Sequence, residues 1–240
     1  MTLKLRSAAV SDRGLIRSAN QDSVHAGPFL VTVADGMGGM AAGDLASAIA
    51  IAAVTPLDVP TPDDGLVDAL RGAVELAGER IRAAVVEDPG REGMGTTLTA
   101  LLMSATGTGL ALAHVGDSRA YLLRGGVLEQ VTRDDTFVQM LVDEGVITPE
   151  EAMNHPRRAV VTQALQGDPV VPAYTVSAPR AGDRWLLCSD GLSNVVREGT
   201  LAETLNGYPD PEECARRLVD LALRAGGPDN ITVVVADIVE

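Results

Sequence analysis

Aromatic side chains are scarce in this sequence of 240 residues and make up only 2% of it. The core must therefore be built from aliphatic side chains, and platforms on which nucleic-acid bases stack are not expected. Basic residues are also in the minority, because 19 Lys and Arg face 33 Asp and Glu and leave a net charge of −14. Such a chain is not suited to binding a polyphosphate backbone by releasing counterions. We therefore expect no nucleic-acid partner.

Cysteine and long apolar runs are equally rare. The two cysteines, Cys188 and Cys214, do not make a disulfide framework, which fits a reducing cytoplasm. Lys4 and Arg6 stand near the N-terminus without the apolar segment of a signal peptide. The longest apolar stretch, at 45–54, is too short to cross a bilayer. We expect a cytoplasmic protein without direct membrane contact in this chain; that it is the cytoplasmic domain of a membrane-anchored protein stays open.

Helical and strand patterns are both present, without an internal repeat. Between Val67 and Val85 apolar residues recur every three or four positions, which predicts an amphipathic helix. A second helix is predicted to start at Asp210-Pro211 and to stop at the Gly-Gly-Pro of 226–228. Strands are predicted at 29–34, 96–103, 110–115, 120–123, 127–132, 184–189 and 231–239, with a tight hairpin turn at 124–127. Strands this close in sequence pair antiparallel, so the predicted fold class is α+β, a layered sandwich.

Residues 136–166 differ from the rest, because they contain only short helical pieces. One of these is predicted to begin at Thr148-Pro149-Glu150-Glu151, a capping box with proline at the first helical position. We interpret this irregular insertion as a mobile lid.

Four aspartates stand where predicted strands meet turns. Asp35, Asp117 and Asp190 each follow a strand, and Asp229 precedes the last one. In antiparallel sheets the end of one strand lies beside the start of its neighbour, so all four can meet at one edge. Crowded carboxylates repel one another unless cations offset their charge, and oxygen ligands without nearby His or Cys favour Mg²⁺ or Mn²⁺ over zinc. The sequence therefore predicts a site for hard metal ions.

The loop VADGMGGMAAG at 33–43 has a second interpretation. Gly36, Gly38 and Ala41 match the G-x-G-x-x-A pattern of loops that bind a dinucleotide. That fold also needs an acidic residue about 20 positions later at the end of a strand. Asp58 has this spacing but lies in a predicted loop, so an oxidoreductase of this kind is disfavoured.

Six short motifs follow one another in a characteristic order. They are GLIRSANQDS, VADGMGG, GMGTTLTALL, GDSRAYLLR, CSDGLS and GGPDNITVVV, between positions 14 and 235. As an ordered set they resemble the motifs of the metal-dependent serine/threonine protein phosphatases (the PPM family), in particular their bacterial, actinobacterial-type catalytic domains. The resemblance implies a four-layer α-β-β-α sandwich with two central antiparallel sheets, formed by residues 1–240 as a single catalytic domain with a flap insertion at 134–168.

The same resemblance implies ligands for the metal ions. Asp35 would bridge two Mn²⁺ or Mg²⁺ ions, and the carbonyl of Gly36 would bind one of them. Asp190 and Asp229 would complete the shell of the first ion. Asp117, with a contribution from Asp190, would serve a third ion.

The implied reaction is hydrolysis of phosphoserine and phosphothreonine in proteins by a hydroxide that bridges the two ions. Arg17 matches the arginine that grips the substrate phosphate, for which its planar fork is suited. Asp22 matches an acidic residue that orients metal-bound water. The expected partners are phosphorylated Ser/Thr proteins, including Ser/Thr kinases, whose action such an enzyme would oppose.

Several positions depart from the family pattern. Met37 stands where many members carry a histidine proposed as general acid, and Gln21 replaces the usual acidic residue before Asp22. In the lid, Gln163 and Ala159 stand where arginine and serine occur in relatives. His155 is a candidate proton donor, although packing within the lid is the favoured interpretation of it. The alternative of a catalytically weak module that only binds phosphoproteins therefore stays open.

A thiol-dependent phosphatase is a further alternative. It requires an arginine six positions after its cysteine, in a loop that cradles the phosphate. Asn194 stands six positions after Cys188, so the spacing is wrong. We expect Cys188 to pack as a small buried apolar side chain.

Overall fold

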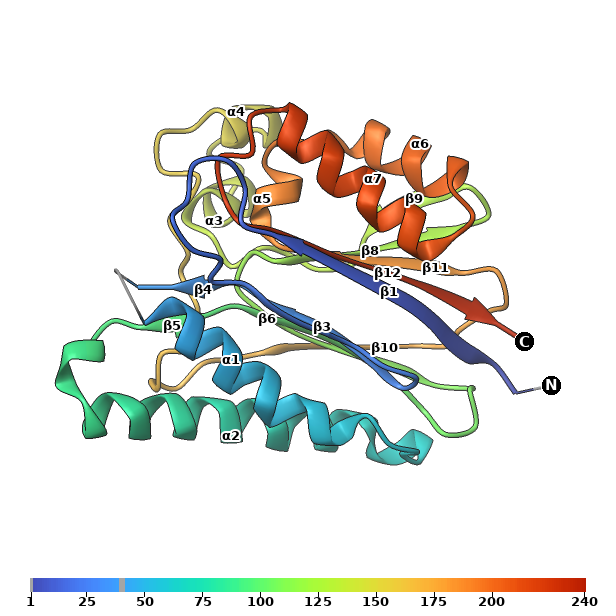
Figure 1. Ribbon diagram of the computed structural model, residues 1–240, viewed down its shortest axis with the longest axis horizontal. Helices are drawn as coiled ribbons and strands as arrows, with labels where there is room; N and C mark the ends of the chain where they lie inside the picture. Colours follow the sequence, from blue (N-terminus) through green and yellow to red (C-terminus); the bar gives the residue numbers. More distant parts are fainter. Residues whose placement is uncertain (1, 39–41) are drawn as a thin grey trace.

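Two five-stranded antiparallel sheets lie face to face at the centre of the molecule (Figure 1). The computed structural model describes residues 2–38 and 42–240. The first sheet has the order β1 (Lys4–Asp12), β12 (Ile231–Val239), β11 (Arg184–Cys188), β8 (Arg119–Arg124) and β9 (Val127–Gln130). The second has the order β10 (Ala173–Ser177), β7 (Leu110–Val115), β6 (Leu98–Met103), β3 (Leu30–Ala34) and β2 (Ser23–Ala26). A separate two-stranded ladder joins β4 (Gly36–Met37) to β5 (Gly95–Thr96).

Helices cover the outer face of each sheet (Figure 1). The second sheet is covered by α1 (Gly43–Val54) and α2 (Leu66–Glu87), and the first by α6 (Glu198–Gly207) and α7 (Pro211–Arg224), with α5 (Asp190–Ser193) at its end. Short 3₁₀ turns occur at Thr55–Leu57, Asp63–Gly65 and Pro89–Arg91. The result is the four-layer α-β-β-α sandwich that the resemblance implied.

The central strands β3, β6, β7, β11 and β12 read as nearly continuous apolar runs because both of their faces are covered. In β12, Ile231, Val233 and Val235 pack against the helices of the first sheet. The alternate residues Val234 and Ala236 pack between the two sheets. Such a strand contributes to two apolar layers, which fits the aliphatic composition of the chain.

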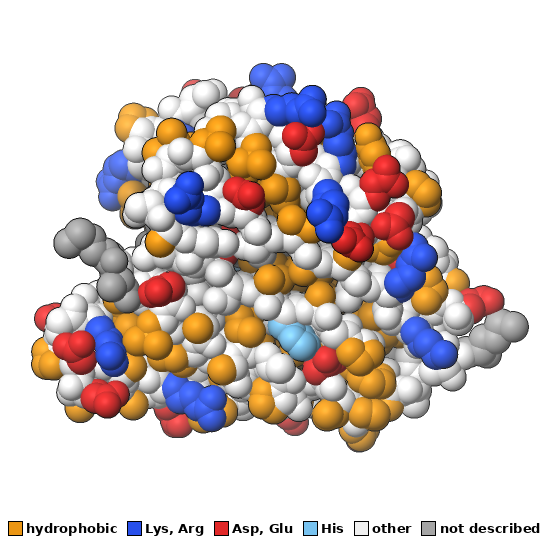
Figure 2. Space-filling model, viewed as in Figure 1, with side chains coloured by type: hydrophobic (Ala, Val, Ile, Leu, Met, Phe, Trp, Pro, Cys, Tyr) orange, Lys and Arg blue, Asp and Glu red, His pale blue; other side chains and the backbone are white. Residues whose placement is uncertain are grey.

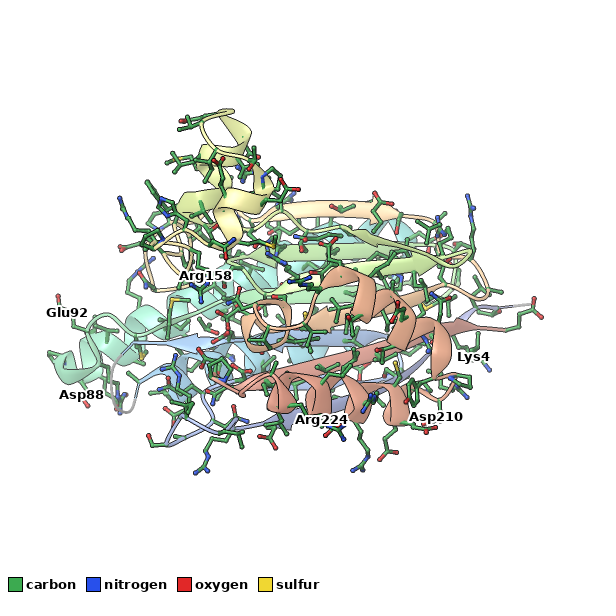
Figure 3. The ribbon with its side chains drawn as sticks, turned by 90° about the horizontal axis from the view of Figure 1, so that it is seen from above. Lys4, Asp88, Glu92, Arg158, Asp210 and Arg224 are labelled. Atoms are coloured by element: carbon green, nitrogen blue, oxygen red, sulfur yellow. The ribbon has the colours of Figure 1, made fainter. Side chains whose placement is uncertain are left out.

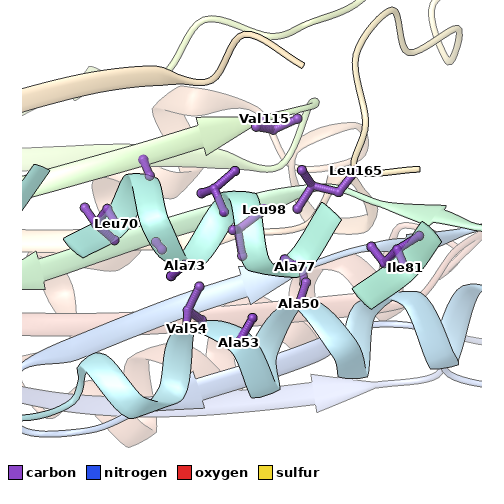
Figure 4. Close-up of a cluster of buried hydrophobic side chains, with 14 of the residues drawn as sticks. Ala50, Ala53, Val54, Leu70, Ala73, Ala77, Ile81, Leu98, Val115 and Leu165 are labelled. Atoms are coloured by element: carbon purple, nitrogen blue, oxygen red, sulfur yellow. The ribbon is translucent and has the colours of Figure 1, made fainter. Parts of the chain in front are cut away.

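The layer between α2 and the second sheet is also built from aliphatic side chains, many of them small (Figure 4). Ala73 and Ala77 of α2 lie close to Ala50 and Ala53 of α1, where small side chains let the two helices approach. Leu165, from the segment that returns from the lid, is only 1% exposed and belongs to this core. One end of the lid is thus anchored in the interior.

The predicted local signals are confirmed in several places. The 67–85 pattern corresponds to α2, and both bonds of the capping box at Thr148 are present at the start of α4 (Pro149–Met153). The Asp210 side chain caps α7 by accepting from two backbone N–H groups, and Asp210 and Arg224 mark the two ends of this helix in Figure 3. Gly125 and Gly126 both have positive φ, as the two-residue turn of the β8–β9 hairpin requires.

Other elements differ from the prediction. The run 96–103 is two strands rather than one, because the chain turns at Thr97 to bond with Asp35. The run 127–132 stays a strand only to Gln130. The strands β1, β2 and β10 and the helix α6 were not predicted, since their sequences mix polar and apolar residues without a clear period. Ala41 of the G-x-G-x-x-A pattern lies outside the described residues.

The lid region forms two short helices, α3 (Phe137–Asp143) and α4, between β9 and β10. They lie at the same end of the sandwich as β4, β5 and α5, whereas both chain termini lie at the opposite end (Figure 1). In the part of the chain that is described, no helix is long and apolar enough to span a membrane. On the face in Figure 2, acidic and basic side chains are interspersed around the edge, so the excess of negative charge is not gathered there.

Candidate functional site

The four strand-end aspartates open onto one cavity of about 660 Å³. β3 and β7 both pair antiparallel with β6, so they run in the same direction and bring Asp35 and Asp117 to one edge. β11 and β12 are antiparallel neighbours, so Asp190 after β11 lies beside Asp229 before β12. The predicted meeting of these side chains is therefore found in the structure. Their roles as ligands stay predictions.

Backbone bonds fix Asp35 at the point where β3 passes into β4. Its N–H donates to Oγ1 of Thr97 over 2.9 Å, and its carbonyl accepts from the Thr97 N–H over 2.9 Å. The Thr96 hydroxyl donates to the same carbonyl over 2.9 Å. The main chain is held on one side, while the carboxylate faces the cavity.

Gly36 also lines the cavity, and close backbone packing requires a glycine there. A Cβ at this position would lie 2.1 Å from the carbonyl oxygen of Gly43 and 2.5 Å from that of Gln21. Any side chain would therefore push apart the start of α1 and the loop before β2.

Asn230 pins the loop at 13–22 to the start of β12. Its Oδ1 accepts from the Gln21 N–H over 2.8 Å, and its Nδ2 donates to the carbonyls of Arg13 (2.8 Å) and Ala19 (2.9 Å). Asn230 stands in the motif GGPDNITVVV, but no role was predicted for it. The available signal was an amide side chain directly after an aspartate that precedes a buried strand.

Arg17, on this pinned loop, reaches into the cavity. One guanidinium nitrogen donates to Oδ2 of Asp229 over 2.6 Å. Half of the Arg17 side chain (53%) is exposed to solvent, so the group is accessible to a ligand from outside.

Asp22 does not line the cavity, unlike the other predicted site residues. The hydroxyl of Ser189 donates to its Oδ2 over 2.8 Å. Its Oδ1 is buried and has no hydrogen-bond partner among the described residues. Asp22 thus lies behind the cavity, close enough to Asp35 for the two carboxylates to repel.

The electrostatic cost of this arrangement is visible in the pKa values. Burial raises the pKa of Asp35 well above its usual range, and repulsion by the neighbouring carboxylates adds to it, first that of Asp22 and then that of Asp190. Burial, and then repulsion by Asp190, raises the pKa of Asp117 to about 7. Burial, and then repulsion by Asp229, raises the pKa of Asp190 to about 6. Cations placed among these groups would stabilise their charged forms.

The oxygen atoms of these aspartates and of the Gly36 backbone are the kind of ligand that a hard cation prefers, but the carboxylates do not surround a single point. Among the described residues, no three His, Cys, Asp or Glu side chains converge as ligands of one ion. Asp229 is turned toward Arg17, and Oδ2 of Asp190 accepts from the Asn194 amide over 3.0 Å. The orphaned Oδ1 of Asp22 and the mutual repulsion of the carboxylates both mark a site short of positive charge.

Three of the departures from the family pattern, Met37, Gln21 and Ala159, line the same cavity, as does Val161 of the lid region. The fourth, Gln163, is not among the residues that line it. His155 packs against Phe137 with ring centroids 6.1 Å apart, and its Nδ1 accepts from the Arg157 N–H over 3.1 Å. This geometry supports packing within the lid as its role.

Two alternatives from the sequence are wrong in the structure. β4 pairs antiparallel with β5, so the loop at Asp35 is not the turn of a parallel βαβ unit. Asp58 caps the turn before β3 by accepting from the N–H groups of Phe29 (2.8 Å) and Leu30 (3.1 Å). Burial raises the pKa of Cys188 to about 12, so its thiol is neutral and inert.

Comparison with known families decides the classification. The family described as "Protein phosphatase 2C" matches residues 17–226, most of the chain. The chain belongs to the protein phosphatase 2C family. The identification made from the six motifs is therefore confirmed.

Two named bacterial relatives of this chain cover it almost completely. It is 56% identical to "Serine/threonine protein phosphatase PstP" of Mycobacterium tuberculosis (strain ATCC 25618 / H37Rv), over 100% of this chain and 46% of the relative. The chain thus spans about half the length of that protein. It is 37% identical to "Serine/threonine phosphatase stp" of Listeria monocytogenes serovar 1/2a, over 95% of this chain and 93% of the relative.

Solved structures agree with the four-layer fold. A crystal structure of the M. tuberculosis phosphatase PstP/Ppp matches with a TM-score of 0.96 and 55% identity, over 99% of this chain and 100% of that one. The catalytic domain of PstP in complex with two manganese ions matches with a TM-score of 0.93 and 55% identity, over the full length of both chains.

Proposed function

We propose that this protein phosphatase 2C chain hydrolyses phosphoserine and phosphothreonine monoesters in proteins with the help of divalent cations. The observation that carries the proposal is one cavity lined by four strand-end aspartates together with Arg17. The names of the relatives support the reaction, and the two manganese ions in the PstP catalytic domain support the metal.

The proposed ligands of two Mn²⁺ or Mg²⁺ ions are Asp35, the Gly36 carbonyl, Asp190 and Asp229. Asp117, with Asp190, would hold a third. When bound, such ions lower the pKa of a water and neutralise charge on the phosphoryl oxygens. The carboxylates of Asp22, Asp190, Asp117 and Asp229 all repel that of Asp35. This central position suits Asp35 to bind two cations.

Arg17 binds and orients the substrate phosphate in this proposal. Its exposed guanidinium has further N–H groups to donate beside the one that meets Asp229. When Asp229 turns to a cation, the nitrogen it leaves becomes available to a phosphate oxygen. The positive charge then lies where negative charge spreads over the equatorial oxygens.

Proton positions follow from Asp22 and Met37. Oδ1 of Asp22 has no hydrogen-bond partner in the described part of the chain, so it is able to accept one from a water and to orient that water from behind the cavity. Met37 lines the cavity but has no proton to donate, so the alcohol leaving group takes its proton from water.

The same proposal covers organisation and partners. Residues 1–240 would act as a single catalytic domain, and 134–168 as its flap, since Ala159 and Val161 face the cavity. The substrates are phosphorylated Ser/Thr proteins, so the opposing reaction must come from Ser/Thr kinases, which themselves carry such groups. A phosphoprotein-binding module without turnover is the second candidate, and the observation in its favour is Met37 in the cavity.

Metal-dependent turnover distinguishes the two. Hydrolysis of p-nitrophenyl phosphate and of a phosphothreonine peptide is measured with Mn²⁺ and after EDTA. We expect turnover with Mn²⁺, none with EDTA, and none in Asp35→Asn. Binding of the phosphopeptide without turnover would favour the module instead.

A matched control guards against a general effect of losing a carboxylate. Asp68→Asn makes the same chemical change on α2, at a side chain that is 77% exposed and contacts Arg71. Its turnover is expected to equal that of the unmodified protein. Near-normal kcat in Asp35→Asn would refute the ligand assignment.

A further inference from the structure

Asp135 holds the residue that precedes Asp117. Its N–H donates to the carbonyl of Gly116 over 2.7 Å, and its Oδ2 accepts from the Gly116 N–H over 2.9 Å. Both backbone polar groups of Gly116 are therefore bound by one residue. Gly116 has a φ of 103°, and a Cβ there would lie 2.6 Å from Cγ2 of Thr97, so this turn has little freedom to adjust.

The same aspartate also holds the far end of the flap. Its carbonyl accepts from the Thr162 N–H over 2.7 Å, and its Oδ1 accepts from Nε2 of Gln163 over 3.0 Å. The flap thus leaves and rejoins the sandwich at Asp135. The intervening Val161 lines the cavity one residue before Thr162.

Gln163 completes this arrangement with both ends of its amide. Nε2 donates to Asp135, and Oε1 accepts from the Val171 N–H over 3.0 Å. A flipped amide would set its oxygen against a carboxylate and its NH₂ against an N–H. The pair therefore has one compatible arrangement of donors and acceptors.

The neighbouring Asp134 has other partners, so the role of Asp135 can be tested separately. Asp134 makes a two-pronged ion pair with Arg119 and accepts from Gln130. The carboxylate of Asp135 by contrast bonds only to neutral N–H groups in the described part of the chain.

We propose that Asp135, with Gln163 as its partner, is a positioning residue that fixes Asp117 and the cavity side of the flap relative to each other. The inference rests on the proposed function, because it gives Asp117 and the flap their part in the site. It also gives Gln163 a role in docking the flap, through its bonds to Asp135 and Val171.

A charge swap tests the pairing. Asp135→Asn keeps the shape of the side chain but sets an NH₂ group against Nε2 of Gln163. Gln163→Glu sets two carboxylates against each other. The double variant Asp135→Asn/Gln163→Glu restores every bond, because the new carboxylate accepts both from the new amide and from Val171. Asp143→Asn, which removes an exposed flap carboxylate bonded to Gln139 and Arg133, is the matched control.

The first measurement is amide hydrogen exchange in the metal-free protein. We expect exchange at Gly116 and at 160–163 to become about tenfold faster in each single variant, as loss of about one hydrogen bond implies. The double variant and Asp143→Asn should stay within about threefold of the unmodified protein. Unchanged exchange in the singles, or a double variant as fast as the faster single, would overturn the proposal.

The second measurement is Mn²⁺ binding by calorimetry together with kcat and KM on p-nitrophenyl phosphate. The weakest class of bound Mn²⁺ should lose about tenfold in affinity in each single variant and recover in the double, because displaced supporting residues weaken metal sites by that order. If Asp135→Asn does not fold, Gln163→Met at its half-buried site removes the same flap bond, and unchanged exchange there would refute the proposal. If the unmodified protein neither binds Mn²⁺ nor turns over, the proposed function fails, while the exchange data still judge the pairing.

Discussion

The guanidinium of Arg17 donates to Asp229 over 2.6 Å, although the two residues are 212 positions apart in the chain. This contact joins the residue proposed to grip phosphate to a residue proposed to hold a cation. It neutralises one of the crowded carboxylates as long as no cation does so. The proposed phosphate and metal sites are thereby linked through a single ion pair.

Replacement of Arg17 is expected to act mainly on substrate binding. Arg17→Ala should raise KM by about tenfold or more, with a smaller fall in kcat, because gripping the phosphate stabilises the bound substrate as well as the transition state. Steady-state kinetics on a phosphothreonine peptide check this. Arg13→Ala, which removes a nearby guanidinium that donates to the Ser18 carbonyl, should leave KM unchanged. An equal KM in the two variants would show that Arg17 does not bind the phosphate.

Removal of metal is expected to destabilise the protein. A ligand at one hundred times its Kd stabilises the folded state by about 2.7 kcal/mol, so Mn²⁺ added to the EDTA-treated protein should raise Tm by several degrees. Thermal unfolding followed by circular dichroism measures the shift. It should shrink in Asp190→Asn and persist in Asp68→Asn. If Mn²⁺ did not change Tm, the proposal that the aspartates bind cations would be contradicted.

Asn230 is expected to matter for stability and for catalysis together. Asn230→Ala removes three hydrogen bonds of about 1 kcal/mol each, so the free energy of unfolding should fall by about 2–3 kcal/mol. KM should rise as well, because the loop that carries Arg17 is no longer pinned. Urea denaturation and peptide kinetics test both effects, with Asn154→Ala on the flap surface as control. Loss of stability without a change in KM would mean that the loop keeps its place by other contacts.

Met37→His is expected to change the pH dependence of kcat more than the fold. An imidazole at this cavity position can donate a proton when it is protonated, below a pKa of about 6.5. We therefore expect kcat of the variant to be higher at low pH and to fall as the pH rises through this pKa. The rate is measured from pH 5.5 to 9 at saturating Mn²⁺. Met153→His, at an exposed flap position, provides the comparison. Identical profiles for all three proteins would exclude this position from proton transfer.

Much of the fold could be predicted where one local signal dominates. The apolar period of α2, the cap at Asp210 and the Gly125-Gly126 turn each depend on neighbouring residues only, and all three are confirmed. β1 and β10 escaped prediction because their pairing with β12 and β7 decides their conformation, not their own pattern.

The site shows the same division. Antiparallel geometry alone predicted that Asp35, Asp117, Asp190 and Asp229 meet, and the structure places them on one cavity. Asn230, Ser189 and Asp135 could not be predicted, because their importance lies in bonds to backbone groups brought near only by the completed fold. Whether each predicted ligand binds an ion stays a prediction for the experiments above.

The first and last strands pair along their whole length, from Lys4 opposite Val239 to Asp12 opposite Ile231. The two ends of the polypeptide therefore lie together at the side of the sandwich away from the cavity. A short linker between them, with new termini opened at the exposed Gly125-Gly126 hairpin, would give a circular permutant that keeps every strand partner. The new termini of this circular permutant would allow reporter domains to be attached at a distance from the flap.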